Sequence, residues 1–296
     1  DGAGPIALPA VDAVVHAAAR FRFAGPRGPY FRTNVRGTRA LLEAARHAGA
    51  ARFVYLSAAA VVMDNRGSPV HNVNESAPTF PNSFSAYIAS KAQSEAVVLA
   101  ADRPGFRTLA IRPPAIWGPG DAFSHAIPHA IGSGQFSFIN RGDYPYATCH
   151  VDNVAEAVKC ALERGAGGRA YFVHDREPTT FREFIAMLAQ LQGLSVDQLK
   201  SVSYRLAFTF GRLMEIGAAI RRLQNDPPLT RTMVRMIGRE FTTDDSAAQR
   251  ELGYVGYVSR ADGLATYGLQ TAGNLGDRTL SEWNGQITRR DTLFSS

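Results

Sequence analysis

Short apolar runs alternate with helix-like segments through the first 112 residues of the chain. The apolar runs occupy residues 11–18, 52–57 and 106–112, and polar or turn-forming residues bound each of them. Between them, residues 30–47 and 85–101 carry apolar side chains at helical spacing. Continuous apolar runs of this length are typical of strands buried on both faces of a parallel sheet. The order of these segments therefore predicts a doubly wound α/β sheet with right-handed crossovers.

Beyond residue 113 the alternation loosens and helical patterns dominate. Thr180 and Glu183 have the spacing of a capping box at the start of a helix. A short strand is expected near 147–151, and helices are expected near 123–131, 152–164, 180–192 and 204–223.

Tyr87 and Lys91 are four residues apart in the second predicted helix. This spacing places both side chains on one face of a helix. A nearby ammonium favours the phenolate, so the tyrosine could exchange a proton with a substrate hydroxyl or carbonyl below its usual pKa of about 10. Because lysine is so rare in this chain, a chance Tyr-x-x-x-Lys is expected roughly 0.1 times. The alternative is a surface tyrosine above a solvated lysine.

Composition limits the classes of protein that the chain could be. With 45% hydrophobic and 20% charged residues, it is expected to be an ordinary soluble protein with a large core. Its net charge of +6 comes from scattered arginines, which predicts no nucleic-acid track. Cys149 and Cys160 lack disulfide-framework and metal-site spacing, so buried free thiols, no metal and a cytoplasmic location are expected.

Residues 204–223 have an amphipathic pattern. The arginines at 205, 212 and 222 fall off its apolar stripe, as does Glu215. The pattern favours a helix that packs on its own domain, and the alternative is a basic helix that lies peripherally on a membrane surface. The stripe consists of Leu206, Phe210, Leu213, Gly217 and Ile220.

Four segments together resemble the extended short-chain dehydrogenase/reductase family, which belongs to the NAD-dependent epimerase/dehydratase superfamily. They occur in the family's order and at about its spacing: DAVVHAAA at 12–19, NVRGT at 34–38, YIASK at 87–91 and RPPAIWGPGD at 112–121. A further segment, HVDNVA at 150–155, resembles a later family motif. The resemblance implies a Rossmann-like fold with NAD or NADP at the carboxyl ends of the strands.

The second half of the chain is similar to the 3β-hydroxysteroid dehydrogenase-like branch of that family. The similar segments are 204–214, 226–231, 241–248 and 251–254. This branch implies an oxidoreductase that interconverts a secondary alcohol and a ketone on a bulky, apolar, steroid-like substrate, with hydride passing to or from the cofactor. Nucleotide-sugar epimerases and dehydratases share the last of these segments and remain an alternative.

The resemblance also assigns roles to individual residues. Tyr87 would be the general acid/base, and Lys91 would lower its pKa and hydrogen-bond the nicotinamide ribose. Asn34 would brace the first strand from the neighbouring helix, although a simple helix-surface amide is an equal alternative. The other residues implied to lie beside the cofactor are His16, Ala17, Ala18, Leu56, Ser57, Pro113, Ala115 and Ile116.

The glycine-rich turn of the family is the first departure from its pattern. Gly2, Gly4, Gly25 and Gly28 lack the Gly-x-x-Gly-x-x-Gly spacing that lets a helix N-terminus approach the pyrophosphate. We therefore expect the chain to begin before the family's fourth strand, with about two strand-helix units of some 30 residues each missing. Those units would hold the residue that separates NAD from NADP, so the choice of cofactor cannot be inferred.

The second departure is at the catalytic hydroxyl. Alignment to the family places Ala58, instead of Ser57, at the position of the catalytic serine or threonine. Ser57 could substitute for it if the strand end bulges, because a one-residue shift reverses the direction of a side chain. Together the two departures leave a catalytically silent or truncated relative as a third alternative.

The domain organisation follows from the same resemblance. We expect a Rossmann-like dinucleotide-binding domain over 1–160, a smaller, mostly helical substrate-binding region over 161–270, and a tail over 271–296. The family also implies a homodimer that forms through the helices near 30–47 and 85–101, with a small-molecule substrate and no nucleic-acid partner.

Overall fold

A four-stranded parallel sheet forms the centre of the computed structural model, which describes residues 6–273 apart from 122, 222 and 224, with only the backbone of 125 and 267–273. The strands lie in the order β1 (Ala13–His16), β2 (Arg52–Leu56), β4 (Arg107–Arg112) and β8 (Ala170–Phe172). Their register places His16 opposite Tyr55, and Tyr55 opposite Ala110. All carboxyl ends therefore reach the same edge of the sheet.

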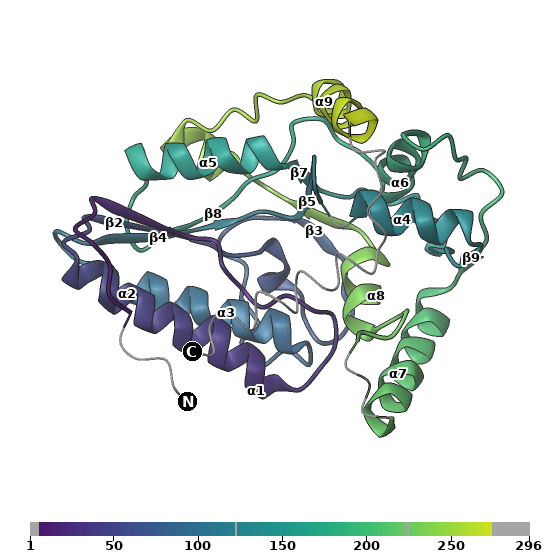
Figure 1. Cartoon of the computed structure of the whole chain (residues 1–296), viewed down its shortest axis with the longest axis horizontal. Coiled ribbons are helices and arrows are strands. Elements are labelled where there is room, and N and C mark those ends of the chain that lie inside the picture. Colours follow the sequence, from purple (N-terminus) through teal and green to yellow (C-terminus); the bar gives the residue numbers. More distant parts are fainter. Residues whose placement is uncertain (1–5, 122, 222, 224, 274–296) are drawn as a thin grey trace.

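Helices cover both faces of this sheet (Figure 1). On one face, α1 (Arg27–Tyr30), a π-helical turn (Phe31–Arg36) and α2 (Gly37–His47) form one continuous helix beside α3 (Ala86–Ala100). On the other face lies α5 (Val151–Arg164). The prediction of a Rossmann-like α/β fold is confirmed.

Alternating side chains along the strands build the two cores. On β2, Phe53 and Tyr55 pack against α2 and α3, whereas Val54 and Leu56 pack towards α5. Phe53, Val54 and Tyr55 are all at most 1% exposed, which explains why this strand is apolar without interruption.

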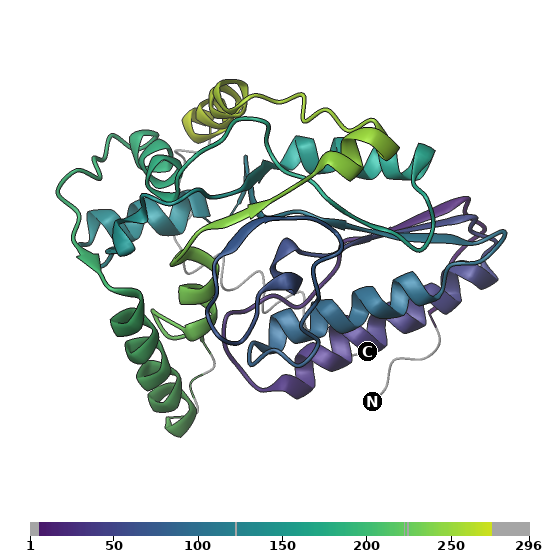
Figure 2. The same cartoon turned by 180° about the vertical axis from the view of Figure 1, so that it is seen from behind.

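A second lobe of helices adjoins the carboxyl edge of the sheet (Figure 2). It contains α4 (Phe123–Gly132), α6 (Phe181–Gln190), α7 (Tyr204–Ile220) and α8 (Arg231–Ile237). The predicted capping box of Thr180 and Glu183 is present at the start of α6. Helix α9 (Arg260–Gly273) comes last among the described elements. The described residues also form three short parallel pairs: β5 (Ala115–Trp117) with β7 (Thr148–His150), β3 (Val70–Val73) with β10 (Phe241–Thr243), and β6 (Phe138–Ile139) with β9 (Ser201–Val202).

One feature differs from the predictions. Strand β1 was expected to be buried on both faces, yet Val15 is 44% exposed, because β1 is an edge strand of the described sheet. The domain division at residue 160 stays a prediction. Strand β8 lies beyond that position, and residues 247–254 return to pack with α5. Most of the predicted tail, residues 274–296, lies outside the described residues.

Candidate active site

Helix α3 carries the predicted Tyr87 and Lys91 to the carboxyl edge of the sheet. Ser85 begins the helix by accepting a hydrogen bond from the Ile88 N–H at 3.4 Å. Lys91 is 2% exposed, and its Nζ donates to the Leu56 carbonyl at the end of β2 at 2.5 Å. The same ammonium lies 4.2 Å from the centre of the Tyr55 ring. The lysine is thus fixed between its own helix and the end of a central strand.

Burial controls the protonation of this pair. It lowers the pKa of Lys91 to about 7, against the opposing effect of the nearby Glu95 carboxylate. Glu95 is itself held by Arg112 in a buried two-pronged ion pair, with N–O distances of 2.6 and 3.0 Å. Burial raises the pKa of the Tyr87 phenol above its usual value. Tyr87 therefore keeps its proton at neutral pH, and a lowering of its pKa by Lys91 stays a prediction.

Asn34 lies in the π-helical turn and ties the end of β1 to α3. Its Nδ2 donates to Ser90 Oγ at 2.8 Å and to the Arg20 carbonyl at 3.1 Å, while its Oδ1 accepts from the Arg20 N–H at 2.7 Å. The side chain is 1% exposed, so it is not a surface amide. π-Helical turns are frequent at functional sites, and this one places a buried amide between the strand end and the neighbour of Lys91.

His16 ends β1 in the same region. Its Nε2 shares a 2.9 Å hydrogen bond with Thr38 Oγ1, and the ring is 7% exposed. Burial, followed by the charge of Lys91, lowers the pKa of His16 to about 4. The imidazole is consequently neutral at pH 7. Ala17 and Ala18, which follow it, are exposed and leave the backbone accessible.

The remaining predicted cofactor residues lie at the neighbouring strand ends. Pro113 follows β4, and its carbonyl accepts from the Ala59 N–H at 2.8 Å. Ala115 and Ile116 belong to β5 and are half-buried. The ends of β1, β2 and β4 thus bring together residues that are far apart in the sequence, at the edge where ligands bind in open α/β sheets.

Ser57 and Ala58 face different surroundings. Ser57 is 5% exposed, and its Oγ is buried without a hydrogen-bond partner among the described residues. Ala58 is half-buried and packs on the same apolar cluster as Tyr87 and Ala115. The structure therefore packs the methyl group of Ala58 against this cluster and encloses the hydroxyl of Ser57.

One aromatic side chain that the sequence did not indicate contacts Tyr87, and two further aromatic pairs follow from the neighbouring loop and α7. Phe21, in the loop after β1, contacts the Tyr87 ring edge-on at 4.7 Å between centroids. Phe23 lies 4.9 Å from Phe21, and Phe84 lies 6.0 Å from Phe208 of α7. Phe21 remains 48% exposed. The pattern Phe-Arg-Phe at 21–23, directly after a strand end, was the signal that could have indicated this apolar wall.

The described residues fit one half of a nicotinamide dinucleotide. A buried ammonium, a tyrosine and exposed backbone at residues 17–18 suit the nicotinamide and its ribose. A pyrophosphate needs a glycine turn between a strand and a helix, and no such turn joins the described strands and helices. Gly25 and Gly28 instead adjoin the start of α1, while Gly2 and Gly4 lie outside the described residues.

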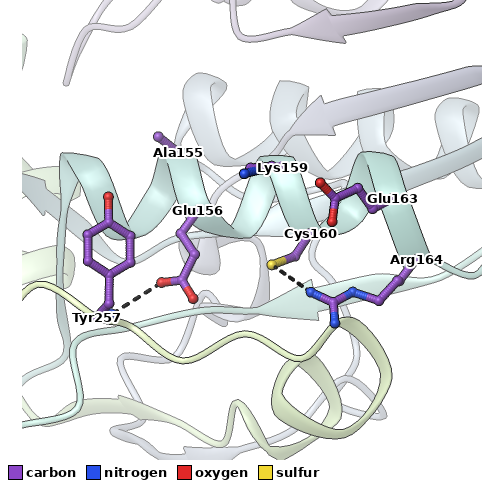
Figure 3. Close-up of a pocket in the computed structure, with 7 residues that line it drawn as sticks. All are labelled: Ala155, Glu156, Lys159, Cys160, Glu163, Arg164 and Tyr257. Carbon is purple, nitrogen blue, oxygen red and sulfur yellow. Dashed lines mark hydrogen bonds between the residues drawn. The ribbon is translucent and has the colours of Figure 1, made fainter.

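A separate hollow of about 520 Å³ lies on α5, on the other face of the sheet from Tyr87 (Figure 3). There Glu156 accepts hydrogen bonds from the backbone N–H groups of residues 255–257. The residues that line the hollow are Ala155, Glu156, Lys159, Cys160, Glu163, Arg164 and Tyr257.

Both cysteines, Cys149 and Cys160, are buried free thiols, as predicted. The part of the chain that the structure describes contains no cluster of three side chains suited to a metal ion.

The fold and the site are those of a Rossmann-like enzyme of the dinucleotide-dependent class, with a tyrosine and a lysine on one helix at the carboxyl edge of the sheet. The sequence pattern of the 3-beta hydroxysteroid dehydrogenase/isomerase family matches residues 6–204, so the chain belongs to this family, as predicted. The chain is 39% identical to a ketoreductase of 4-hydroxy-2-methyl-3-oxo-4-farnesyl-3,4-dihydroquinoline-1-oxide from Stigmatella aurantiaca, over 86% of this chain and 75% of that protein. It is 33% identical to a 2-alkyl-3-oxoalkanoate reductase from Stenotrophomonas maltophilia, over 87% and 80% respectively.

A solved structure supports the fold assignment. A dTDP-glucose 4,6-dehydratase from Streptomyces venezuelae, solved with NAD, superposes with a TM-score of 0.67 at 25% identity, over 90% of this chain and 75% of that one. The likeness is one of architecture, and architecture alone assigns no substrate.

Proposed function

We propose that the chain is an NAD(P)-dependent oxidoreductase that interconverts a ketone and a secondary alcohol on a bulky, apolar, steroid-like substrate. The observation that carries this proposal is the buried ammonium of Lys91. Lys91 lies on the same helix as Tyr87, and its ammonium donates a hydrogen bond to the Leu56 carbonyl at the end of β2. A lysine so placed has a reason to be buried if it binds a polar ligand group at the strand ends. The bound dinucleotide would supply or accept the hydride.

The protonation of Tyr87 favours the reducing direction. Because burial raises its pKa, the phenol keeps its proton at pH 7 and can donate it to a carbonyl oxygen as hydride arrives at the carbon. Lys91, with a pKa near 7, loses its charge as the pH rises above that value. Reduction should therefore be faster below pH 7 than above pH 8. The reducing direction is the one for which two relatives, a ketoreductase and a reductase, are named.

The apolar substrate is supported by the wall of aromatic rings at the site. Phe21 contacts Tyr87, and Phe84 lies on the preceding turn. Two arginines of α8 are already paired with carboxylates: Arg231 with Glu215 at 2.7 Å and Arg235 with Asp64 at 3.2 Å. A polar, anionic substrate would have to compete for them, whereas an apolar ketone would not.

A nucleotide-sugar epimerase or dehydratase is the second candidate, because the dehydratase from Streptomyces venezuelae shares the fold. Thermal melting separates the two. Under our proposal an apolar ketone raises the melting temperature of the dinucleotide-loaded chain and dTDP-glucose or UDP-glucose does not. The reverse result would reject the apolar substrate.

The proposed reaction is tested by following NADH and NADPH consumption with a long-chain β-ketoacid or a 3-ketosteroid. Tyr87→Phe should lose at least about a hundredfold in rate, since it removes the proton donor. Tyr257→Phe, on the other face of the sheet, serves as the matched control and should keep its rate. Calorimetric titration with NAD, NADP and their reduced forms gives the cofactor. A folded chain that binds none of them would be a silent relative.

We also infer a homodimer through the helix over 27–47 and α3, which lie side by side on one face of the sheet (Figure 1). The support is this continuous two-helix surface, which an isologous partner could cover with the same surface. Light scattering gives the mass directly, and a monomer at micromolar concentration would rule the dimer out.

A further inference from the structure

One side of α7, together with Leu223 just after the helix, exposes seven large apolar side chains, which we call the exposed apolar row. These were expected to pack on the chain's own domain, but they point away from it. In both views α7 lies at the edge of the molecule (Figures 1 and 2). The exposed fractions range from 39% to 77% for Leu206, Phe210, Leu213, Met214, Ile216, Ile220 and Leu223. Monomeric proteins rarely present so many large apolar groups together unless they bind something.

The opposite side of α7 makes the contacts with the protein. Tyr204, Ala207 and Gly211 are buried, and Gly211 lies against the backbone at the start of α8. Glu215, the acidic residue of α7, is turned to the same side, where its carboxylate binds Arg231. Packing and negative charge are therefore confined to the inner side, and the outer side is free of carboxylates.

Arginines border the exposed apolar row. With about 100° per residue, Arg205 and Arg212 fall along one margin and Arg221 along the other. All three are exposed, and none of their guanidinium groups pairs with a described carboxylate. An apolar strip with cations along its margins matches a surface that is apolar inside and anionic at its boundary.

We propose that α7 lies flat on an anionic lipid surface, with its apolar row among the acyl chains and the three arginines at the headgroups. No helix within the described residues is long and apolar enough to cross a membrane, so an in-plane orientation is the one that α7 can adopt. Charge distinguishes lipid from a second copy of the chain. Symmetric pairing of two α7 helices would bring arginine margins together, while anionic headgroups neutralise them.

Flotation with phosphatidylcholine vesicles, with and without phosphatidylserine, tests this directly and needs neither cofactor nor substrate. The full chain should bind the anionic vesicles and lose binding in high salt. Leu213→Asp should weaken binding about tenfold or more, because it places a charge in the acyl layer. Tyr257→Asp, at a residue that is 63% exposed on the α5 side, is the matched control and should bind as the wild type does.

The arginines are tested by charge-matched variants. Replacing Arg205, Arg212 and Arg221 together with Gln should weaken binding roughly a hundredfold at low salt, at about fivefold for each cation. Replacing Arg103, Arg164 and Arg250, which are exposed and lie outside α7 and the proposed dimer helices, lowers the net charge equally and should have little effect. Circular dichroism verifies that each variant is folded.

Two results would overturn the proposal. Equal losses in both arginine triples would mean that net charge alone attracts the chain to lipid. The second result has two parts: the wild type forms a dimer but binds no vesicles, and Leu213→Asp is a monomer. The exposed apolar row would then be a protein interface instead.

Discussion

At the scale of single residues, Ala58 gives the sharpest test of the proposed site. It packs against the same apolar cluster as Tyr87, at the position that the family resemblance assigns to a catalytic hydroxyl, while the hydroxyl of Ser57 is enclosed. We predict that Ala58→Ser raises kcat/KM for ketone reduction about tenfold, because a second donor would then orient the carbonyl. Steady-state rates with the preferred dinucleotide measure this.

Ser57→Ala completes the comparison. If Ser57 has no catalytic part, this variant keeps its rate within about twofold and gains slight stability, since it removes a buried hydroxyl that lacks a partner. A large rate loss in Ser57→Ala, with no gain in Ala58→Ser, would show that Ser57 supplies the hydroxyl.

His16 links stability to pH. Its pKa in the folded chain is about 4, below the usual 6.5, so between these values the unfolded chain binds more protons than the folded one. Stability should therefore be fully present above pH 6.5 and fall as the pH drops towards 4, by about 3 kcal/mol. Urea unfolding across this range, compared with His16→Gln, isolates the effect. An equal loss in the variant would assign it to other groups.

At the scale of elements, the sequence predicted the strands and helices well where one pattern had one explanation. The apolar runs at 52–57 and 106–112 became β2 and β4, and Tyr87 with Lys91 lies on α3 as expected. Exposure was the harder problem. Val15 of β1 and Leu213 of α7 belong to apolar patterns that match buried elements, and periodicity alone cannot tell which side of an element has a neighbour.

The site was predictable only in part for a related reason. Lys91, Asn34 and His16 belong to local motifs that are visible in the sequence. Phe21 and Phe208 come from segments almost 190 residues apart, and no spacing rule connects them. The π-helical turn at Asn34 depends on side chains of α3, because Ser94 Oγ donates to the Asn34 carbonyl at 2.8 Å. Tertiary contacts of this kind leave no local pattern.

Gly211 sets how closely α7 and α8 approach. A Cβ atom there would lie 2.9 Å from the Thr230 carbonyl carbon and 3.0 Å from the Arg231 nitrogen, both of them backbone atoms. We predict that Gly211→Ala lowers the free energy of unfolding by about 1–3 kcal/mol, because the helices must separate. Gly217→Ala is the control: nothing lies within 4 Å of its Cβ position, so higher helix propensity should stabilise it by up to about 1 kcal/mol. Chemical denaturation of both variants compares them.

At the scale of the whole molecule, Asp226 connects the two lobes at the active site. Its carboxylate, in the loop after α7, accepts from the backbone N–H groups of Phe23 and Ala24 at 2.9 and 3.1 Å, and pairs with Arg22 at 3.3 Å. It thereby holds the loop that places Phe21 against Tyr87. The C-terminal lobe thus positions an N-terminal aromatic side chain over the proposed acid.

Removing that connection should affect substrate binding more than chemistry. We predict that Asp226→Ala raises KM for a bulky ketone several-fold, leaves kcat within about threefold, and lowers stability by about 1–2 kcal/mol through the loss of charge-assisted hydrogen bonds. Asp197→Ala, whose carboxylate bonds only within its own turn to Ser195, is the matched control for kinetics and denaturation. If instead kcat fell and KM did not change, the loop would be acting on Tyr87 itself, because misplacing the proton donor slows the chemical step after the substrate has bound.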